Sequence, residues 1–385
     1  MTMNRAVESD LVERLLAGEH RALARVITKI ESQTSGYRDL VSEIHAHTGQ
    51  ASVVGITGSP GAGKSTLVDK LAKYYRDQGE TVGVIAVDPS SPYTGGAVLG
   101  DRIRMASNVG DMDVFFRSMS ARGQLGGLST ATADAVKALD AFGKDRIIIE
   151  TVGAGQNEVD VVKTADTVVV LVQPGSGDDV QMLKAGILEI GDVFVVNKAD
   201  MEGASRTVAE LEEMIHLRDD PRANLDTGHH GAGAFGDSGG HGHGGDHGHG
   251  DNAHGHNDTN GHDTAGHDGD EDAAAEVARP VWTPKVIKTI ATTGEGIDTL
   301  VETLDDHYDY LSESGELTEK ARQRASEEIR QLLRSDVNRL LEAEIERRGG
   351  IDDFADAVVD KETDPYEVAE DVLEPIRECL EDRDD

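Results

Sequence analysis

The feature that most constrains the fold is a glycine-rich loop between an apolar run and helix-forming sequence. Residues 53–57 read Val-Val-Gly-Ile-Thr, and Gly-x-x-x-x-Gly-Lys-Ser follows at residues 58–65. This order predicts a strand, a phosphate-binding loop and a helix. Glycines let the backbone aim consecutive N–H groups at one anion, and the helix N-terminus adds its positive end. The sequence therefore predicts a site for the phosphates of a nucleotide.

The residue types in this loop have predicted roles. Lys64 is expected to reach the β- and γ-phosphates and to act in catalysis, while the Ser65 hydroxyl is placed to bind Mg²⁺. The nucleotide-binding residues predicted here are Gly58, Ser59, Pro60, Gly61, Ala62, Gly63, Lys64, Ser65 and Thr66.

Short apolar runs alternate with helix-forming segments after this loop. The runs lie at 51–57, 82–87, 146–149, 167–172 and 193–196, and a final strand is expected at 285–291. Continuous apolar runs of this length suit strands buried on both faces. The predicted fold is therefore α/β, a P-loop NTPase with a mostly parallel sheet flanked by helices. Functional residues are then expected at the carboxyl ends of the strands.

A second motif, Asn197-Lys198-Ala199-Asp200, directly follows the run at 193–196. The Asp200 carboxylate can accept the ring N–H and the exocyclic amine of guanine, whereas adenine presents the opposite polarity. Asn197 can brace the loop and contact the base, and the Lys198 stem can cover the face of the base. A site built on such hydrogen bonds can reject the wrong base by roughly 10⁴-fold. GTP is thus favoured over ATP.

Three acids are candidates for organising Mg²⁺ and the attacking water. Asp88 follows the second apolar run, Glu150 follows the third, and Asp101 lies between them. Carboxylates in such places bind Mg²⁺ directly or through water, or orient water, so Asp101 and Glu150 are also predicted to act in catalysis. A helix-cap or turn role explains each acid alone about as well. The N–H of Gly153 is placed to sense the γ-phosphate, which would make the segment after Glu150 a switch.

Helical segments are expected at both ends of the chain. Residues 1–48 are predicted to form a helical extension, 49–312 the nucleotide-binding domain, and 313–385 a C-terminal helical region. The C-terminal stretch carries one apolar stripe made of Ile329, Leu332, Leu333, Val337, Leu340, Leu341 and Ile345. Such a stripe must be covered, and packing on the chain's own globular domain is one explanation.

The composition excludes several classes of function. The net charge is −36, from 73 acidic and 37 basic residues, so nucleic acid and anionic membranes would repel the chain. An acidic, solvated surface of this kind is typical of proteins adapted to high salt. No apolar run approaches the roughly 20 residues that span a bilayer, and the start has no signal-peptide core. With a single cysteine, Cys379, the protein is expected to be cytoplasmic.

Five motifs follow one another in a distinctive order: VDPSSPYTGGAVLGDRIRM at 87–105, RSMSARGQLGGLS at 117–129, ETVGAGQNEVD at 150–160, QPGSGDDVQMLKAGI at 173–187, and Asn197 to Asp200. Together they resemble the MeaB/ArgK group of GTPases, which are G-protein chaperones of methylmalonyl-CoA mutase and related cobalamin-dependent mutases. The resemblance covers roughly residues 10–215 and 281–345.

The resemblance implies a homodimeric, Mg²⁺-dependent GTPase that gates adenosylcobalamin delivery to a mutase. It places Asp88, Asp101 and Glu150 in the metal and switch region, and residues 174–184 in an additional switch that communicates with the partner. It also places Ala291 in the last base-contacting loop, where Ile290 departs from the usual serine. The C-terminal stripe would then contribute to the dimer.

The larger departure is a stretch at 224–277 that carries ten of the fifteen histidines. Its low hydrophobicity predicts a disordered insert. Its imidazoles either bind divalent metal ions such as Ni²⁺ or Zn²⁺, or belong to a solvated spacer. Two alternatives therefore remain beside the mutase chaperone: a nickel-insertion GTPase and a small-molecule kinase. The missing paired-cysteine site disfavours the first, and the guanine motif disfavours the second.

Overall fold

The computed structural model describes residues 2–88, 106–108, 110–120, 127–151, 163–175, 187–219 and 281–381. The chain divides into two units, one of Met1–Ile215 with Val281–Asp385 and the other of His216–Pro280. The larger unit contains the sheet and both nucleotide motifs. The predicted insert at 224–277 lies outside the described residues.

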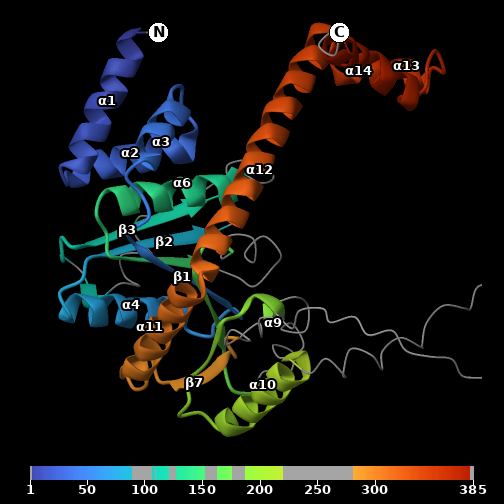
Figure 1. The fold of residues 1–385 in the computed structure, drawn as a ribbon. Helices are drawn as coiled ribbons and strands as arrows, with labels where there is room; N and C mark the ends of the chain where they lie inside the picture. The colour runs from blue at the N-terminus through green and yellow to red at the C-terminus, as the bar shows by residue number, and fades with distance from the viewer. Residues whose placement is uncertain are drawn as a thin grey trace, which may run out of the picture. The chain divides into compact units, whose positions relative to one another are not determined.

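The described residues form a seven-stranded parallel sheet in the order β3-β2-β4-β1-β5-β6-β7 (Figure 1). The strands are β1 (Ser52–Gly58), β2 (Val82–Asp88), β3 (Val114–Ser120), β4 (Arg146–Thr151), β5 (Thr167–Val172), β6 (Val193–Asn197) and β7 (Lys285–Thr289). The prediction of an α/β fold with a parallel sheet is confirmed. β3 was not predicted, and β7 ends two residues before the predicted boundary.

Helices cover both faces of the sheet, as alternating strand residues require. Val53 packs with α6 (Gly127–Ala141) and with the N-terminal helices α1 (Thr2–Leu16), α2 (His20–Ser32) and α3 (Tyr37–His45). Val54, on the other face, packs with α4 (Lys64–Asp77) and α11 (Ile297–Ser314). β5 and β6 also pack against α10 (Ala204–Asp219), with α9 (Ile187–Ile190) beside it. In Figure 1, α6 and α4 lie on opposite sides of the strands.

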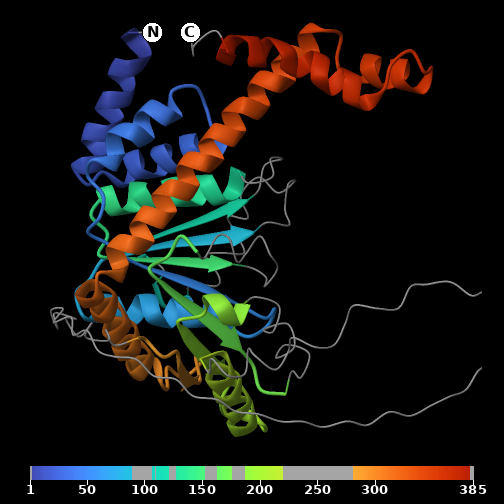
Figure 2. The ribbon, with the colours of Figure 1, turned by 45° about the vertical axis from the view of Figure 1, so that its right-hand side comes forward.

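The C-terminal region is helical, with α12 (Glu316–Arg347), α13 (Ile351–Val359) and α14 (Pro365–Glu381). α12 crosses α6 obliquely (Figure 2), and all of its side chains are described, yet none is buried. Polar pairs hold it to the domain: Arg38 with Asp336, Lys137 with Glu328, and Arg324 with Asp166.

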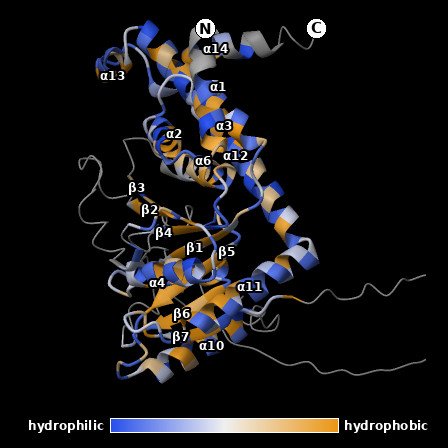
Figure 3. Cartoon of the chain, turned by 90° about the vertical axis from the view of Figure 1, so that its left-hand side faces the viewer, coloured by the Kyte–Doolittle hydropathy of each residue, from blue (hydrophilic) through white to orange (hydrophobic). Residues whose placement is uncertain are grey.

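The predicted apolar stripe on α12 is not buried within the chain. Ile329, Leu333, Val337 and Leu340 are 58%, 60%, 48% and 64% exposed. Figure 3 shows apolar and polar residues alternating along the helix. The chain's own domain is therefore attached to α12 by charged groups and leaves these apolar side chains in solvent.

An aromatic cluster joins the amino ends of the strands to α11. The Trp282 indole N–H donates to the Asp192 carbonyl at 2.9 Å, and its ring lies 4.7 Å from that of His307. His307 Nδ1 is hydrogen-bonded to Thr167 Oγ1 at 2.8 Å, and its Nε2 is 3.6 Å from Asp192. Burial, helped by the charge of Lys320, lowers the pKa of His307 to about 3. The ring is therefore neutral at physiological pH.

Candidate nucleotide-binding site

The loop after β1 needs glycine for two different reasons. Gly58 has φ of 134°, and a Cβ there would lie 2.0 Å from the Leu171 carbonyl oxygen of β5. Gly63 has φ of 96°, and a Cβ there would lie 2.4 Å from Asn197 Nδ2. The loop is thus pressed against the ends of β5 and β6, and only glycine fits between them.

The predicted phosphate-binding lysine lies over the loop backbone. Lys64 is 6% exposed, and its Nζ donates to the carbonyl oxygens of Gly58 at 2.6 Å and Ser59 at 3.0 Å. It is the first residue of α4, so its charge and the N–H groups of the first helical turn lie together. Such an arrangement suits an anionic phosphate chain.

The predicted metal ligands that the structure describes meet each other. The Ser65 hydroxyl donates to Glu150 Oε1, and Glu150 is 5% exposed near the end of β4. β4 is hydrogen-bonded to β1, with Ile56 opposite Glu150. A hydroxyl and a carboxylate are hard oxygen donors, so this pair fits Mg²⁺.

The remaining acids are only partly placed. Asp88 ends β2, which pairs with β4, so its backbone lies at the same edge as Glu150. The side chain of Asp88 and the whole of Asp101 and Gly153 lie outside the described residues. Their predicted roles in metal binding and switching therefore stay predictions.

The Asn197 side chain ties three loops together. It is 2% exposed, and its Nδ2 donates to the Ala62 carbonyl at 2.7 Å. Its Oδ1 accepts the Thr289 hydroxyl at 3.1 Å and the Ala291 N–H at 3.0 Å. A guanine contact from Ala291 would therefore compete with this hydrogen bond. These hydrogen bonds join the base loop to the phosphate loop and to the loop after β7, while a contact of Asn197 with the base stays a prediction.

Lys198 crosses from this loop to the phosphate loop. Its φ is 59°, and its Nζ donates to the Gly61 carbonyl at 2.8 Å and to Gln173 Oε1 at 2.9 Å. Asp200, two residues after Lys198, is exposed to solvent. The sequence did not single out Gln173 as a site residue. In the sequence it stands out only as the first residue of the family-like motif at 173–187, directly after a buried strand.

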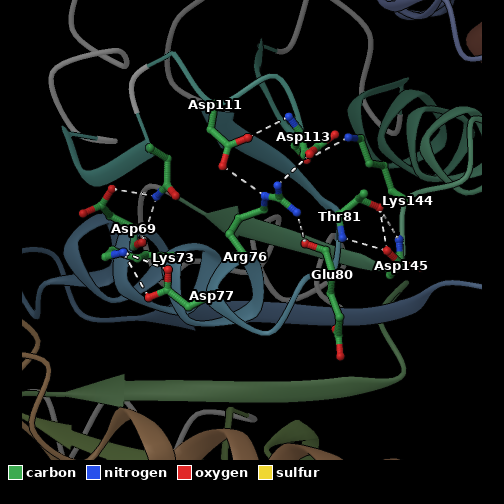
Figure 4. A network of polar contacts seen from close by, with 11 residues as sticks. Asp69, Lys73, Arg76, Asp77, Glu80, Thr81, Asp111, Asp113, Lys144 and Asp145 are labelled. Carbon is green, nitrogen blue, oxygen red and sulfur yellow. Dashed lines mark hydrogen bonds and ion pairs between the residues drawn. The ribbon is translucent and has the colours of Figure 1, made fainter.

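A second network holds η1 (Ala106–Asn108) against the phosphate-loop helix (Figure 4). Asp69 on α4 is 5% exposed and accepts the Ser107 N–H and Asn108 Nδ2, both at 3.0 Å. Two turns later, Arg76 pairs with two acids that precede β3, Asp111 and Asp113. These contacts fix the chain that follows the region containing Asp101.

The family comparison agrees with this geometry. The family model described as Methylmalonyl Co-A mutase-associated GTPase MeaB matches residues 23–346. The chain belongs to the MeaB/ArgK family of P-loop GTPases.

Individual relatives extend over much of the chain. A Pyrococcus horikoshii protein, provisionally named a GTPase, is 44% identical over 367 residues, which are 95% of this chain and 98% of that protein. GTPase ArgK of Escherichia coli is 38% identical over 51% of this chain and 61% of its own length. The mouse protein Methylmalonic aciduria type A homolog, mitochondrial, is 30% identical over 80% of this chain and 64% of its own length.

A solved structure supports the fold. LAO/AO transport system kinase superposes with a TM-score of 0.60 at 23% identity, over 97% of this chain and 98% of its own. As a GTPase of this family, the chain binds GTP. No helix in the described part of the chain has an apolar stretch long enough to span a bilayer.

Proposed function

We propose that this GTPase is a Mg²⁺-dependent chaperone of methylmalonyl-CoA mutase or a related cobalamin-dependent mutase, gating the loading of adenosylcobalamin and protecting the enzyme. The observation that carries the proposal is the family match over residues 23–346, since the family is described as mutase-associated. The relative named for methylmalonic aciduria supports it. A bound GTP would supply, through its hydrolysis, the nucleotide switch that such gating needs.

The described residues suit phosphoryl transfer from GTP to water. Lys64 and the N–H groups at the start of α4 stabilise charge on the phosphates. Ser65 and Glu150 would hold Mg²⁺, which would supply positive charge to stabilise the phosphates. Asn197 and Lys198 fix the base loop on the phosphate loop, and Asp200 reads guanine. Asp101 remains a candidate for orienting water.

The test is GTP hydrolysis in molar salt, with and without the mutase from the same source. We expect the mutase to stimulate hydrolysis, and Lys64→Ala to remove the activity. Lys73→Ala is the matched control, because Lys73 lies on the same helix, half exposed and paired only with Asp77 among the described contacts. Absence of both stimulation and mutase binding would sink the chaperone role.

Hydrolysis measured with and without the mutase also tests the two alternative functions, a nickel-insertion GTPase and a small-molecule kinase. The described residues contain no cluster of three or more histidine, cysteine or acidic side chains for a metal. A nickel-insertion role would therefore depend on residues 224–277. Deletion of this stretch should leave mutase-stimulated hydrolysis intact. A phosphorylated small-molecule product formed from GTP would instead favour a kinase.

We also propose that the chain forms a homodimer through α12. Support comes from the exposed residues Ile329, Leu333, Val337 and Leu340, which the chain's own domain leaves uncovered. Leu333→Glu should convert a dimer to a monomer in sedimentation velocity. Asn338→Glu adds the same charge at an exposed polar position on another face of α12 and should leave the dimer intact. A monomeric wild-type chain would contradict the proposal.

A further inference from the structure

The Lys198 ammonium group donates hydrogen bonds to two acceptors, one in the loop after β1 and one directly after β5. Its Nζ donates to the Gly61 carbonyl in the phosphate loop at 2.8 Å and to the Gln173 side-chain carbonyl at 2.9 Å. Gln173 directly follows β5, and β5 lies between β1 and β6 in the sheet. The glutamine thus stands midway between the strand that leads to the phosphate loop and the strand that leads to the base loop.

The end of β5 already supports the phosphate loop through its backbone. The Ser59 N–H donates to the Leu171 carbonyl at 3.3 Å, and Gly58 packs against the same oxygen. Gln173, two residues further on, extends this support to the base loop through Lys198. The phosphate loop and the base loop are therefore both anchored to the carboxyl end of β5.

We propose that Gln173 is a positioning residue for nucleotide retention: it holds Lys198 in place, so that the phosphate loop and the base loop keep one spacing. The proposal rests on the assigned GTP site. Lys198 carries a long flexible side chain and a backbone φ of 59°, a conformation that residues other than glycine adopt infrequently. With a single acceptor, the ammonium group is free to rotate about its stem. A second acceptor fixes its direction and, through Gly61, the phosphate loop.

The position of Gln173 predicts which kinetic quantity changes. Its contact is to Lys198, which is on the base side of the site, whereas Ser65 and Glu150 lie on the phosphate side. Loss of the contact between Gln173 and Lys198 should weaken the binding of GDP and of GTP by similar factors and leave kcat unchanged. A residue that acted on the chemical step would lower kcat at saturating GTP.

The experiment measures release of a fluorescent GDP analogue from the full chain by stopped flow. Gln173→Met keeps the length and removes the acceptor, and should speed release about tenfold, the size expected for one hydrogen bond to a charged group. Gln173→Glu keeps an acceptor oxygen for Lys198 and should release at the wild-type rate or slower. Gln323→Met, at an exposed position on α12, is the matched control.

The paired variant Lys198→Met with Gln173→Met tests whether the effect passes through the lysine. Release from the pair should equal release from Lys198→Met alone, because the glutamine then has no ammonium to hold. Wild-type release from Gln173→Met, or equally fast release from Gln173→Met and Gln173→Glu, would overturn the proposal. If the wild-type chain fails to bind the analogue at all, the GTP site itself is wrong.

Discussion

At the residue scale, the packing around Gly58 allows no residue other than glycine at this position. Its missing side chain would overlap the Leu171 carbonyl oxygen, which is part of the sheet and cannot move away. We expect Gly58→Ala to lower the free energy of unfolding by more than about 3 kcal/mol and to abolish nucleotide binding. Urea unfolding and equilibrium binding of GDP check this.

Gly79→Ala separates overlap from backbone strain. Gly79 has φ of 89°, but a Cβ there would meet no described atom within 4 Å. Its substitution should cost only the conformational strain, about 1 kcal/mol. Equal destabilisation by the two alanines would show that the overlap at Gly58 is relieved.

His307 makes stability depend on pH in a defined direction. Its pKa falls from 6.5 when unfolded to about 3 when folded, so unfolding takes up a proton below pH 6.5. Its contribution is complete above pH 6.5 and is lost progressively as the pH falls toward 3. Between pH 7.5 and 5 this amounts to about 2 kcal/mol.

His307→Leu isolates this term from other titrating groups, including neighbouring Asp192, Lys320 and Tyr310. The variant also removes the partner of Thr167, so its stability is lower at both pH values. Its loss between pH 7.5 and 5, from urea unfolding, should nevertheless be smaller than that of the wild type. An unchanged loss would mean that His307 is already protonated in the fold.

At the element scale, α4 joins the phosphate loop to the chain that precedes β3. Asp69 accepts two hydrogen bonds from η1, and both donors lose this partner if the carboxylate is removed. Asp69→Ala should therefore lower the free energy of unfolding by about 2 kcal/mol. Asp77→Ala on the same helix removes only the exposed pair with Lys73 and should cost less than about 0.5 kcal/mol. Urea unfolding of both variants measures the difference, and equal losses would show that Asp69 does not anchor η1.

Some strands of the sheet can be predicted from the sequence more easily than others. The strands buried on both faces, such as β5 with Thr-Val-Val-Val-Leu-Val, were predicted because burial leaves no place for polar residues. β3 was missed because it is an edge strand, mostly half-buried, and Arg117 and Ser118 interrupt its apolar run. The pattern on α12 predicted a helix, but periodicity cannot say what covers an apolar face.

The site residues also fall into those that the sequence predicts and those that it does not. The phosphate and guanine motifs are local in sequence, so their residues could be named before the structure. The contacts of Asn197 with Ala62 and of Lys198 with Gln173 join distant segments, and only the sheet order brings them together. Gln173 begins the motif at 173–187, but the motif alone does not say which distant side chain the glutamine contacts.

At the scale of the whole molecule, repulsion among the acids should govern stability. With 73 acidic and 37 basic residues, screening should stabilise the fold as the Debye length falls from about 10 Å at 0.1 M to about 3 Å at 1 M salt. The urea midpoint should therefore rise with potassium chloride over this range. Salt also screens the ion pair of Arg38 with Asp336, which helps to hold α12, but this pair is partly exposed and contributes little to stability.

Sucrose is the control, because it favours the compact state without screening charge. The gain from salt should level off near 1 M, whereas the gain from sucrose should continue with concentration. A urea midpoint that stays flat or falls with salt would contradict a fold limited by its own charge.

The aromatic cluster gives the molecule a built-in optical signal. Trp282 is the single tryptophan of the chain, and its ring contacts that of His307 in a tilted arrangement, two residues after the boundary at Pro280. Fluorescence excited at the red edge of the indole band therefore reports on one known place without a label. Opening of this corner would change the surroundings of the indole, so a change in its emission with intact ellipticity would time the opening separately from global unfolding.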